Sequence, residues 1–284
     1  MQAEEADVRW VVLPGLALTP EDFAPLARVL DPVGQVRVLD AWRTPVTAPA
    51  DELRAALGVG GPGTAGTDDG VGLVGHSAGG LAALEWTLLH PDEVRRLVLL
   101  DPMSPFEKQR PALHPGTAAT RAVRTVVGKT ADLVAPSVGP RLRAAAVRVV
   151  ARRPDRLPRD VAAARYGDRL GWLEIADQWS ASWAQAPRVR ALLDAGHRVP
   201  PTTGPLLVSG LRASARFLRE QRELAERLGL PRVGLPGQGH LFPLTRPDVV
   251  GHLARAVRLG PSAVPDPSGG HADDVVARPR STTA

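Results

Sequence analysis

With 284 residues, the chain can bury one substantial core with an insertion, or at most two small domains. Its hydrophobic fraction of 44% and charged fraction of 23% are typical of a globular protein that is neither disordered nor embedded in a membrane. The absence of cysteine excludes disulfides, thiolate nucleophiles and cysteine-ligated metals, and the net charge of +5 comes from arginines spread along the whole chain, without an aromatic and basic motif for nucleic acid.

Strands and helices are predicted to alternate in the first hundred residues. Continuous apolar runs predict buried strands at residues 8–13, 36–39, 71–74 and 97–100. Helices are predicted at residues 20–30, 50–57 and 81–90, and the glycine-rich residues 58–70 are expected to form a surface loop. This alternation favours a parallel sheet that is covered by helices on both faces.

The pattern changes at about residue 103, and no strand is predicted before residue 203. Arginine and alanine recur there with helical spacing, and prolines at positions 111, 136, 154, 158 and 187 are expected to separate the helices. Strands are again predicted at residues 206–210 and 232–235, and helices at 215–228 and 248–259. We therefore expect an α/β protein with about six strands, in which residues 8–102 and 204–259 form the core and residues 103–203 an inserted helical cap.

Neither end of the chain is predicted to contribute to the core. Residues 1–7 are acidic and polar and lack the pattern of a signal peptide, and no later segment is long and apolar enough to span a bilayer, so a cytoplasmic location is expected. Residues 260–284 are rich in proline, serine and glycine, a composition that favours a disordered tail.

The most informative motif is the stretch Gly-His-Ser-Ala-Gly-Gly at residues 75–80, between a predicted strand and a predicted helix. Small neighbours allow the sharp turn that exposes the hydroxyl of Ser77 as a nucleophile. The motif resembles the nucleophile elbow of the α/β-hydrolase fold. The resemblance spans about residues 8–259 and implies a parallel sheet with flanking helices and a helical lid above the serine.

The resemblance also implies a histidine base after the last strand. A serine needs a neighbouring base, which must in turn be held in one tautomer by an acid. His240 follows the predicted strand at residues 232–235 in the sequence Gly-Gln-Gly-His-Leu and matches this place. The other six histidines lie at positions that the resemblance does not connect with catalysis.

The acid is not at the place where the family most often carries it. No carboxylate occurs in residues 211–216, directly after the strand at 206–210, and Glu220 and Glu223 lie farther along the next helix. Some members of the fold carry the acid one strand earlier, where this chain has Asp101. The order Ser77, Asp101, His240 is the one expected for the fold, although an aspartate before proline can also simply cap a turn.

Two main-chain donors are expected to stabilise the oxyanion of the reaction. The N–H of Ala78, directly after the nucleophile, is one of them. By resemblance, Leu16 in the turn after the first strand supplies the other, with Pro14 in place of the histidine that is common there. A purely structural turn is the alternative for this second segment.

The cap contains tryptophans and arginines that could contact a substrate. Trp179 and Trp183 are four residues apart and share one helical face, which could line an apolar acyl pocket. Packing of the cap on the core is the favoured interpretation of this face. Arginines of the cap could attract an anionic substrate, but a solvated helical face is again favoured; they include Arg141, Arg143, Arg148, Arg152 and Arg153.

These features together predict a serine hydrolase of esters or thioesters, with a small-molecule acyl substrate and no nucleic-acid or membrane partner. Haloalkane dehalogenases and epoxide hydrolases of this fold carry an aspartate at the elbow, which Ser77 cannot replace. No cofactor or metal is expected, because no cluster of ligating residues and no phosphate loop is present. Acyl transfer, peptidase action and carbon–carbon bond cleavage stay open, as does a non-catalytic ligand-binding protein that has lost the acid.

Overall fold

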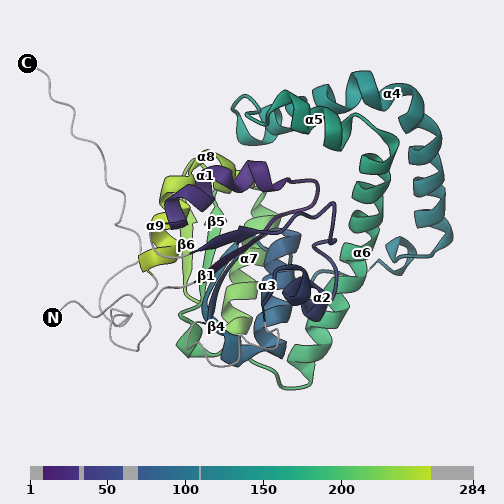
Figure 1. Ribbon diagram of the computed structural model, residues 1–284. Helices are drawn as coiled ribbons and strands as arrows, with labels where there is room; N and C mark the ends of the chain where they lie inside the picture. Colours follow the sequence, from purple (N-terminus) through teal and green to yellow (C-terminus); the bar gives the residue numbers. More distant parts are fainter. Residues whose placement is uncertain (1–8, 32–34, 60–69, 109, 257–284) are drawn as a thin grey trace, which may run out of the picture.

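The computed structural model describes residues 9–31, 35–59, 70–108 and 110–256. Within them, six strands form one sheet in the order β2-β1-β3-β4-β5-β6, and all neighbouring pairs are parallel (Figure 1). The strands are β1 (Arg9–Leu13), β2 (Val36–Val38), β3 (Val71–His76), β4 (Val94–Leu100), β5 (Leu206–Gly210) and β6 (Arg232–Leu235). The predicted six-stranded α/β fold is thereby confirmed.

The described helices follow the predicted alternation in the core. The α-helices are α1 (Pro20–Leu30), α2 (Ala50–Ala56), α3 (Ala78–Leu89), α4 (Ala118–Ala151), α5 (Arg159–Tyr166), α6 (Arg169–Asp194), α7 (Ala215–Leu228), α8 (Phe242–Thr245) and α9 (Pro247–Ala256). Short 3-10 helices are η2 (Pro91–Glu93), η3 (Pro111–Leu113) and η4 (Pro201–Thr203). The expected tail at residues 260–284, the acidic residues 1–7 and most of the expected loop at 58–70 lie outside the described residues.

Successive side chains of each strand enter two separate cores, one on each face of the sheet. Val11 and Leu13 pack with α2, α3 and α7, whereas Trp10 and Val12 pack with α1, α8 and α9. This division follows from the two-residue period of a strand. Because both faces are covered, the central strands β1, β3 and β5 consist mostly of buried apolar residues, whereas the edge strands β2 and β6 each include an exposed arginine.

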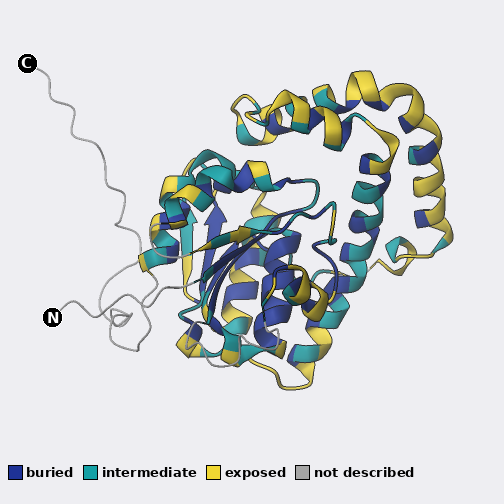
Figure 2. Ribbon diagram, in the orientation of Figure 1, coloured by how far each residue is buried: buried dark blue, intermediate teal, exposed yellow. Residues whose placement is uncertain are grey.

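Helix α3 is buried on almost every side (Figure 2). One face packs on the sheet, and its residues Leu81, Leu84 and Leu88 pack against the last turns of α6. A helix enclosed in this way carries apolar residues all round instead of one apolar stripe. Helix α3 is therefore a rigid support for the residue that precedes it, Ser77.

Helices α4, α5 and the first part of α6 form a layer beside the sheet core, within the segment predicted as a cap (Figure 1). The expectation that Pro136 and Pro187 separate helices is wrong, because they lie inside α4 and α6. A proline within a helix removes one hydrogen bond and bends the axis without having to end the helix. With Pro136 and Pro140 near its middle, the 34-residue α4 is bent in Figure 1. The division of the chain at residues 103 and 203 stays a prediction.

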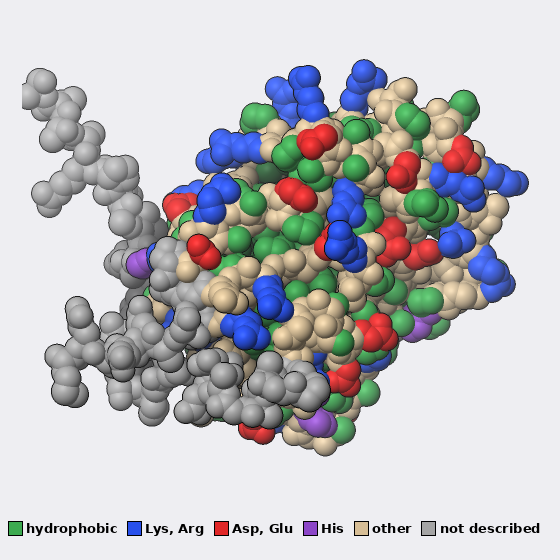
Figure 3. Space-filling model, in the orientation of Figure 1, with side chains coloured by type: hydrophobic (Ala, Val, Ile, Leu, Met, Phe, Trp, Pro, Cys, Tyr) green, Lys and Arg blue, Asp and Glu red, His purple; other side chains and the backbone are tan. Residues whose placement is uncertain are grey.

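The surface of this layer carries many basic side chains with acidic ones among them (Figure 3). Arg141 and Arg148 are exposed, as favoured from the sequence, but Arg143 is buried on the inner side of α4. The solvated-face interpretation is therefore wrong for Arg143. In the described part of the chain, none of the helices is long and apolar enough to cross a membrane.

Candidate active site

Ser77 occupies the turn between β3 and α3 in a strained backbone conformation. Its φ of 56° and ψ of −118° are rare for a residue with a side chain. The turn is tight: a Cβ atom on Gly75 would lie 2.4 Å from the carbonyl oxygen of Gly79. Ser77 is partly exposed whereas its neighbours His76 and Ala78 are buried. The predicted elbow geometry is thus present, with the serine as its accessible residue.

The topology of the sheet favours a ligand site at the carboxyl ends of β1 and β3. The strand order reverses between β1 and β3, so the segments that follow these two strands diverge at their carboxyl ends. In open α/β sheets, ligands bind in the crevice that this divergence creates. Leu16 follows β1 and Ser77 follows β3, so the two predicted site segments flank the same crevice.

Asp101 and His240 meet as the sequence predicts for a triad. The Nδ1 atom of His240 lies 3.3 Å from Oδ2 of Asp101. The other oxygen of Asp101 accepts a hydrogen bond from the N–H of Gly210 at 3.1 Å. Asp101 follows β4 with a φ of 42°, and its side chain is fully buried. Burial raises the pKa of Asp101, while the contacts with His240 and Gly210 act in the opposite direction.

His76 holds the backbone of His240 in place through a hydrogen bond. The Nε2–H of His76 donates to the carbonyl oxygen of His240 at 2.9 Å, and the two rings lie 4.7 Å apart. Burial, with a contribution from His240, lowers the pKa of His76 to about 3. His76 is therefore neutral and acts as a fixed donor. On the other side, Phe217 of α7 contacts the imidazole of His240 edge to face at 5.9 Å.

These two contacts of His240 were not predicted from the sequence. The position of His76 beside Ser77 was a signal, because a residue at the end of β3 must lie near the loop after β6 if His240 reaches the serine. No comparable feature of the sequence pointed to the contact between Phe217 and His240. Among the described residues, the Ser77 hydroxyl forms no hydrogen bond with His240; such contacts are often long before substrate binds.

The turn after β1 packs directly on the elbow. A Cβ atom on Gly15 would lie 3.1 Å from Cβ of Ser77, so Leu16 is brought close to the serine. The N–H of Leu18 donates to the carbonyl oxygen of Gly15 at 3.2 Å, and Ala17 has a φ of 57°. Ala78 is the first residue of α3, where an N–H has no acceptor within the helix. Both predicted oxyanion donors therefore belong to segments that adjoin Ser77.

Helices α4 and α5 contact this turn and the helix that follows it from the other side. The hydroxyl of Tyr166, at the end of α5, donates to the carbonyl oxygen of Ala17 at 2.7 Å. In α4, the Nη2 atom of Arg143 donates to Asp22 at 2.6 Å, where α1 begins. Arg143 also lies over the ring of Tyr166. The segment that carries Leu16 and the start of α1 are thus each held by one polar contact, from α5 and α4 respectively.

Trp179 and Trp183 lie together on α6 as predicted, with ring centroids 6.5 Å apart in an edge-to-face arrangement. Both are half-buried. Arg110 lies over the ring of Trp183. Neither tryptophan lines the pocket beside His240, so the structure does not bring them together with the predicted base.

That pocket has a volume of about 550 Å³ and opens between the end of α4 and the start of α7. His240 forms part of its wall, and Ser77 does not line it. The other side chains of its wall include Val149, Val150, Arg152, Arg212 and Phe217. Arg212 was not predicted as a site residue.

Among the described residues, no cluster of three or more acidic or histidine side chains could hold a metal ion.

Comparisons with known proteins agree with the observed fold. A model of the family described as alpha/beta hydrolase fold matches residues 65–197, which include Ser77 and Asp101. No curated protein matches the sequence.

Solved structures resemble the chain over most of its length. A haloalkane dehalogenase from Bradyrhizobium elkanii is similar with a TM-score of 0.56 and 18% identity, over 89% of each chain. A thermophilic esterase from Thermogutta terrifontis has a TM-score of 0.55 and 18% identity, over 87% of this chain and 88% of its own. A peroxisomal alpha-beta-hydrolase from Saccharomyces cerevisiae has a TM-score of 0.56 and 16% identity, over 92% of this chain and 81% of its own. The chain therefore has the α/β-hydrolase fold.

Proposed function

We propose that the protein is a serine hydrolase that cleaves esters or thioesters through an acyl-enzyme. The observation that carries this proposal is the contact between His240 and the buried carboxylate of Asp101, next to the strained turn of Ser77. The sequence left open a ligand-binding protein without an acid. A carboxylate within reach of the imidazole favours the enzyme instead.

Each residue has a defined part in the proposed reaction. Asp101 accepts the Nδ1–H of His240, which leaves Nε2 of the imidazole free to take the hydroxyl proton of Ser77. The serine oxygen then forms a bond to the carbonyl carbon, and the negative oxygen that results is stabilised by the N–H groups of Leu16 and Ala78. His240 returns the proton to the leaving group as the bond to that group breaks.

The second half of the reaction repeats these steps with water. His240 takes a proton from water, whose oxygen attacks the acyl-serine ester, and the proton returns to Ser77 as the acid is released. The chemistry of serine supports acyl transfer to water over the alkyl-enzyme route of the dehalogenases and epoxide hydrolases, which use an aspartate at this position. A small-molecule substrate and a cytoplasmic location stay predictions.

A burst experiment tests the proposal. With p-nitrophenyl acetate, a stoichiometric release of nitrophenol is expected before the steady state, because acylation of Ser77 by this activated ester is faster than hydrolysis of the acyl-enzyme. The Ser77→Ala variant should lose both the burst and the turnover. Ligand binding without turnover by the wild-type protein would contradict the proposal. Product analysis with added alcohols, peptides or diketones separates the related serine chemistries.

A further inference from the structure

The wall of the pocket beside His240 is positively charged. It contains the arginines Arg152 and Arg212 and no acidic residue. Helix α7 begins at the same wall, where Ser214 caps it by accepting the N–H of Phe217. The amino end of a helix carries a partial positive charge. Two guanidinium groups and a helix end therefore favour a negatively charged ligand group in this pocket.

Arg212 is held in place within the wall. Its Nη2 atom donates to the carbonyl oxygen of Val150 at 2.7 Å, at the end of α4. Its backbone N–H donates to the carbonyl oxygen of Gln238 at 2.7 Å. A guanidinium has five N–H donors, so this contact leaves others for a ligand. The arginine is thus tied both to the cap and to the turn that carries His240.

Gly239 provides the space for this guanidinium. A Cβ atom at this position would lie 2.8 Å from Nη2 and 3.3 Å from Nε of Arg212. The planar group therefore lies directly against the residue that precedes His240. Because it is positioned by its surroundings, little conformational entropy is lost when it binds a carboxylate in a bidentate manner.

The place of the pocket indicates which part of the substrate it contacts. His240 lines the pocket and Ser77 does not. In the proposed reaction, Nε2 of His240 takes the proton of Ser77 and gives it to the leaving group, so the leaving atom lies within reach of this nitrogen and the rest of the group extends along the imidazole into a pocket that His240 lines. The volume of about 550 Å³ is in the range of small-molecule sites.

We propose that this pocket binds the leaving group of the substrate and that Arg212 binds a carboxylate on it. The inference rests on the proposed function and names its substrate class: esters or thioesters whose alcohol or thiol part carries a carboxylate. Val149, Val150 and Phe217 provide apolar contacts for the carbon skeleton between this carboxylate and the scissile bond.

Two acetate esters with matched leaving groups test the proposal. In 3-acetoxybenzoate the leaving group is an anion, and in 3-acetoxybenzamide it is neutral and of the same shape. Both esters form the same acetyl-enzyme, so a difference in kcat/KM reports only on the leaving-group site. We expect the wild-type value to be at least about tenfold higher for the carboxylate, the scale of a charge-assisted hydrogen bond.

The variant Arg212→Met keeps an unbranched apolar stem in place of the first part of the arginine side chain and removes the charge. It should lower kcat/KM about tenfold for 3-acetoxybenzoate and change the value for the amide less than about twofold. Arg219→Met is the control, because it removes the same charge from α7 outside the pocket wall. Equal effects of Arg212→Met on both esters, or equal effects of the two variants, would overturn the proposal.

A binding measurement separates this proposal from the proposed function. If neither ester is cleaved and Ser77 is not acylated, the hydrolase function fails. Saturation-transfer NMR then compares 3-hydroxybenzoate with 3-hydroxybenzamide. Binding of the carboxylate alone, lost in Arg212→Met, supports the anionic site. Equal or absent binding of the two compounds overturns it.

Discussion

Asp101 uses both of its carboxylate oxygens, one for His240 and one for the N–H of Gly210. Replacement by asparagine preserves the shape of the side chain, but its amide nitrogen cannot accept the Nδ1–H of the imidazole. We expect Asp101→Asn to lower kcat for p-nitrophenyl acetate by about 10³- to 10⁴-fold through the wrong tautomer of His240. Asp177→Asn, in an exposed part of α6, is the control. An unchanged kcat and pH profile in Asp101→Asn would show that Asp101 only caps a turn.

His76 makes the stability of the protein sensitive to acid. Its ordinary pKa of 6.5 applies to the unfolded chain, whereas in the folded protein it is lowered to about 3. As the pH falls below 6.5, the unfolded chain binds a proton that the folded protein does not bind, so the free energy of unfolding decreases. Between pH 6.5 and pH 4 this single residue should contribute a loss of about 3 kcal/mol.

The variant His76→Gln isolates this contribution, because glutamine keeps an N–H donor for the carbonyl of His240 and does not titrate. Urea unfolding at several pH values measures both proteins. Between pH 6.5 and pH 4, the decrease in the free energy of unfolding should be smaller in the variant than in the wild type by about 3 kcal/mol. Parallel curves for the two proteins would mean that folding does not lower the pKa of His76.

At the scale of elements, two helical glycines are expected to respond oppositely to alanine. A Cβ atom on Gly79 of α3 would lie 2.1 Å from the carbonyl oxygen of Leu13, whereas the nearest atom to a Cβ on Gly128 of α4 is 3.5 Å away. Gly79→Ala should lower the free energy of unfolding by about 1–3 kcal/mol, because it forces β1 away from the elbow. Gly128→Ala should raise it by up to about 1 kcal/mol through helix propensity. Urea unfolding measures the free energy of unfolding of both variants. Equal changes of the same sign in the two variants would contradict this packing.

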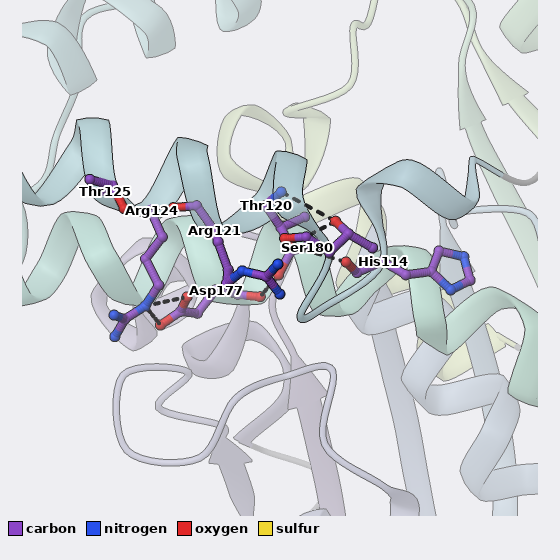
Figure 4. A network of polar contacts seen from close by, with 8 residues as sticks. His114, Thr120, Arg121, Arg124, Thr125, Asp177 and Ser180 are labelled. Atoms are coloured by element: carbon purple, nitrogen blue, oxygen red, sulfur yellow. Dashed lines mark hydrogen bonds and ion pairs between the residues drawn. The ribbon is translucent and has the colours of Figure 1, made fainter.

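Two ion pairs of α4 differ in burial and should differ in their effect on stability. Arg143 pairs with Asp22 across the boundary between cap and core, and both side chains are at most 5% exposed. Arg124 pairs with Asp177 of α6 (Figure 4). Here the two side chains are 57% and 45% exposed. Arg143→Met should lower the free energy of unfolding by about 3–5 kcal/mol, because it leaves a buried carboxylate without its partner.

Arg124→Met serves as the matched control, with an expected loss of less than about 1 kcal/mol. Thermal or urea unfolding measures both variants. Similar small losses would show that the cap does not depend on the buried pair for its position.

Local chemistry explains which elements could be predicted. The helix at Pro20–Leu30 begins after a threonine with proline at its first position, and the helix at Ala215–Leu228 ends before a glycine, so their bounds were predictable. The prediction that Pro136 and Pro187 separate helices was wrong, because a proline can bend a long helix that packs against its neighbours without ending it. The short α8 was missed, since four residues carry too little periodicity.

At the scale of the whole molecule, the topology of the sheet accounts for the predictable part of the site. Parallel strands place the segments after β1, β3, β4 and β6 at one edge, so the meeting of Asp101 with His240 follows from chain order. The contacts made by the cap do not follow from chain order. Tyr166 with Ala17 and Arg212 with Val150 depend on how α4 and α5 lie on the core. Nothing in the local sequence pattern specifies that placement.

If Ser77 is a nucleophile activated by His240, a fluorophosphonate should label it, and peptide mass spectrometry identifies the labelled residue. We expect a single adduct on Ser77 in the wild-type protein and labelling slowed at least about a hundredfold in His240→Ala, the scale of general base catalysis. Absence of an adduct on Ser77, or labelling at the same rate in His240→Ala, would contradict this role of Ser77.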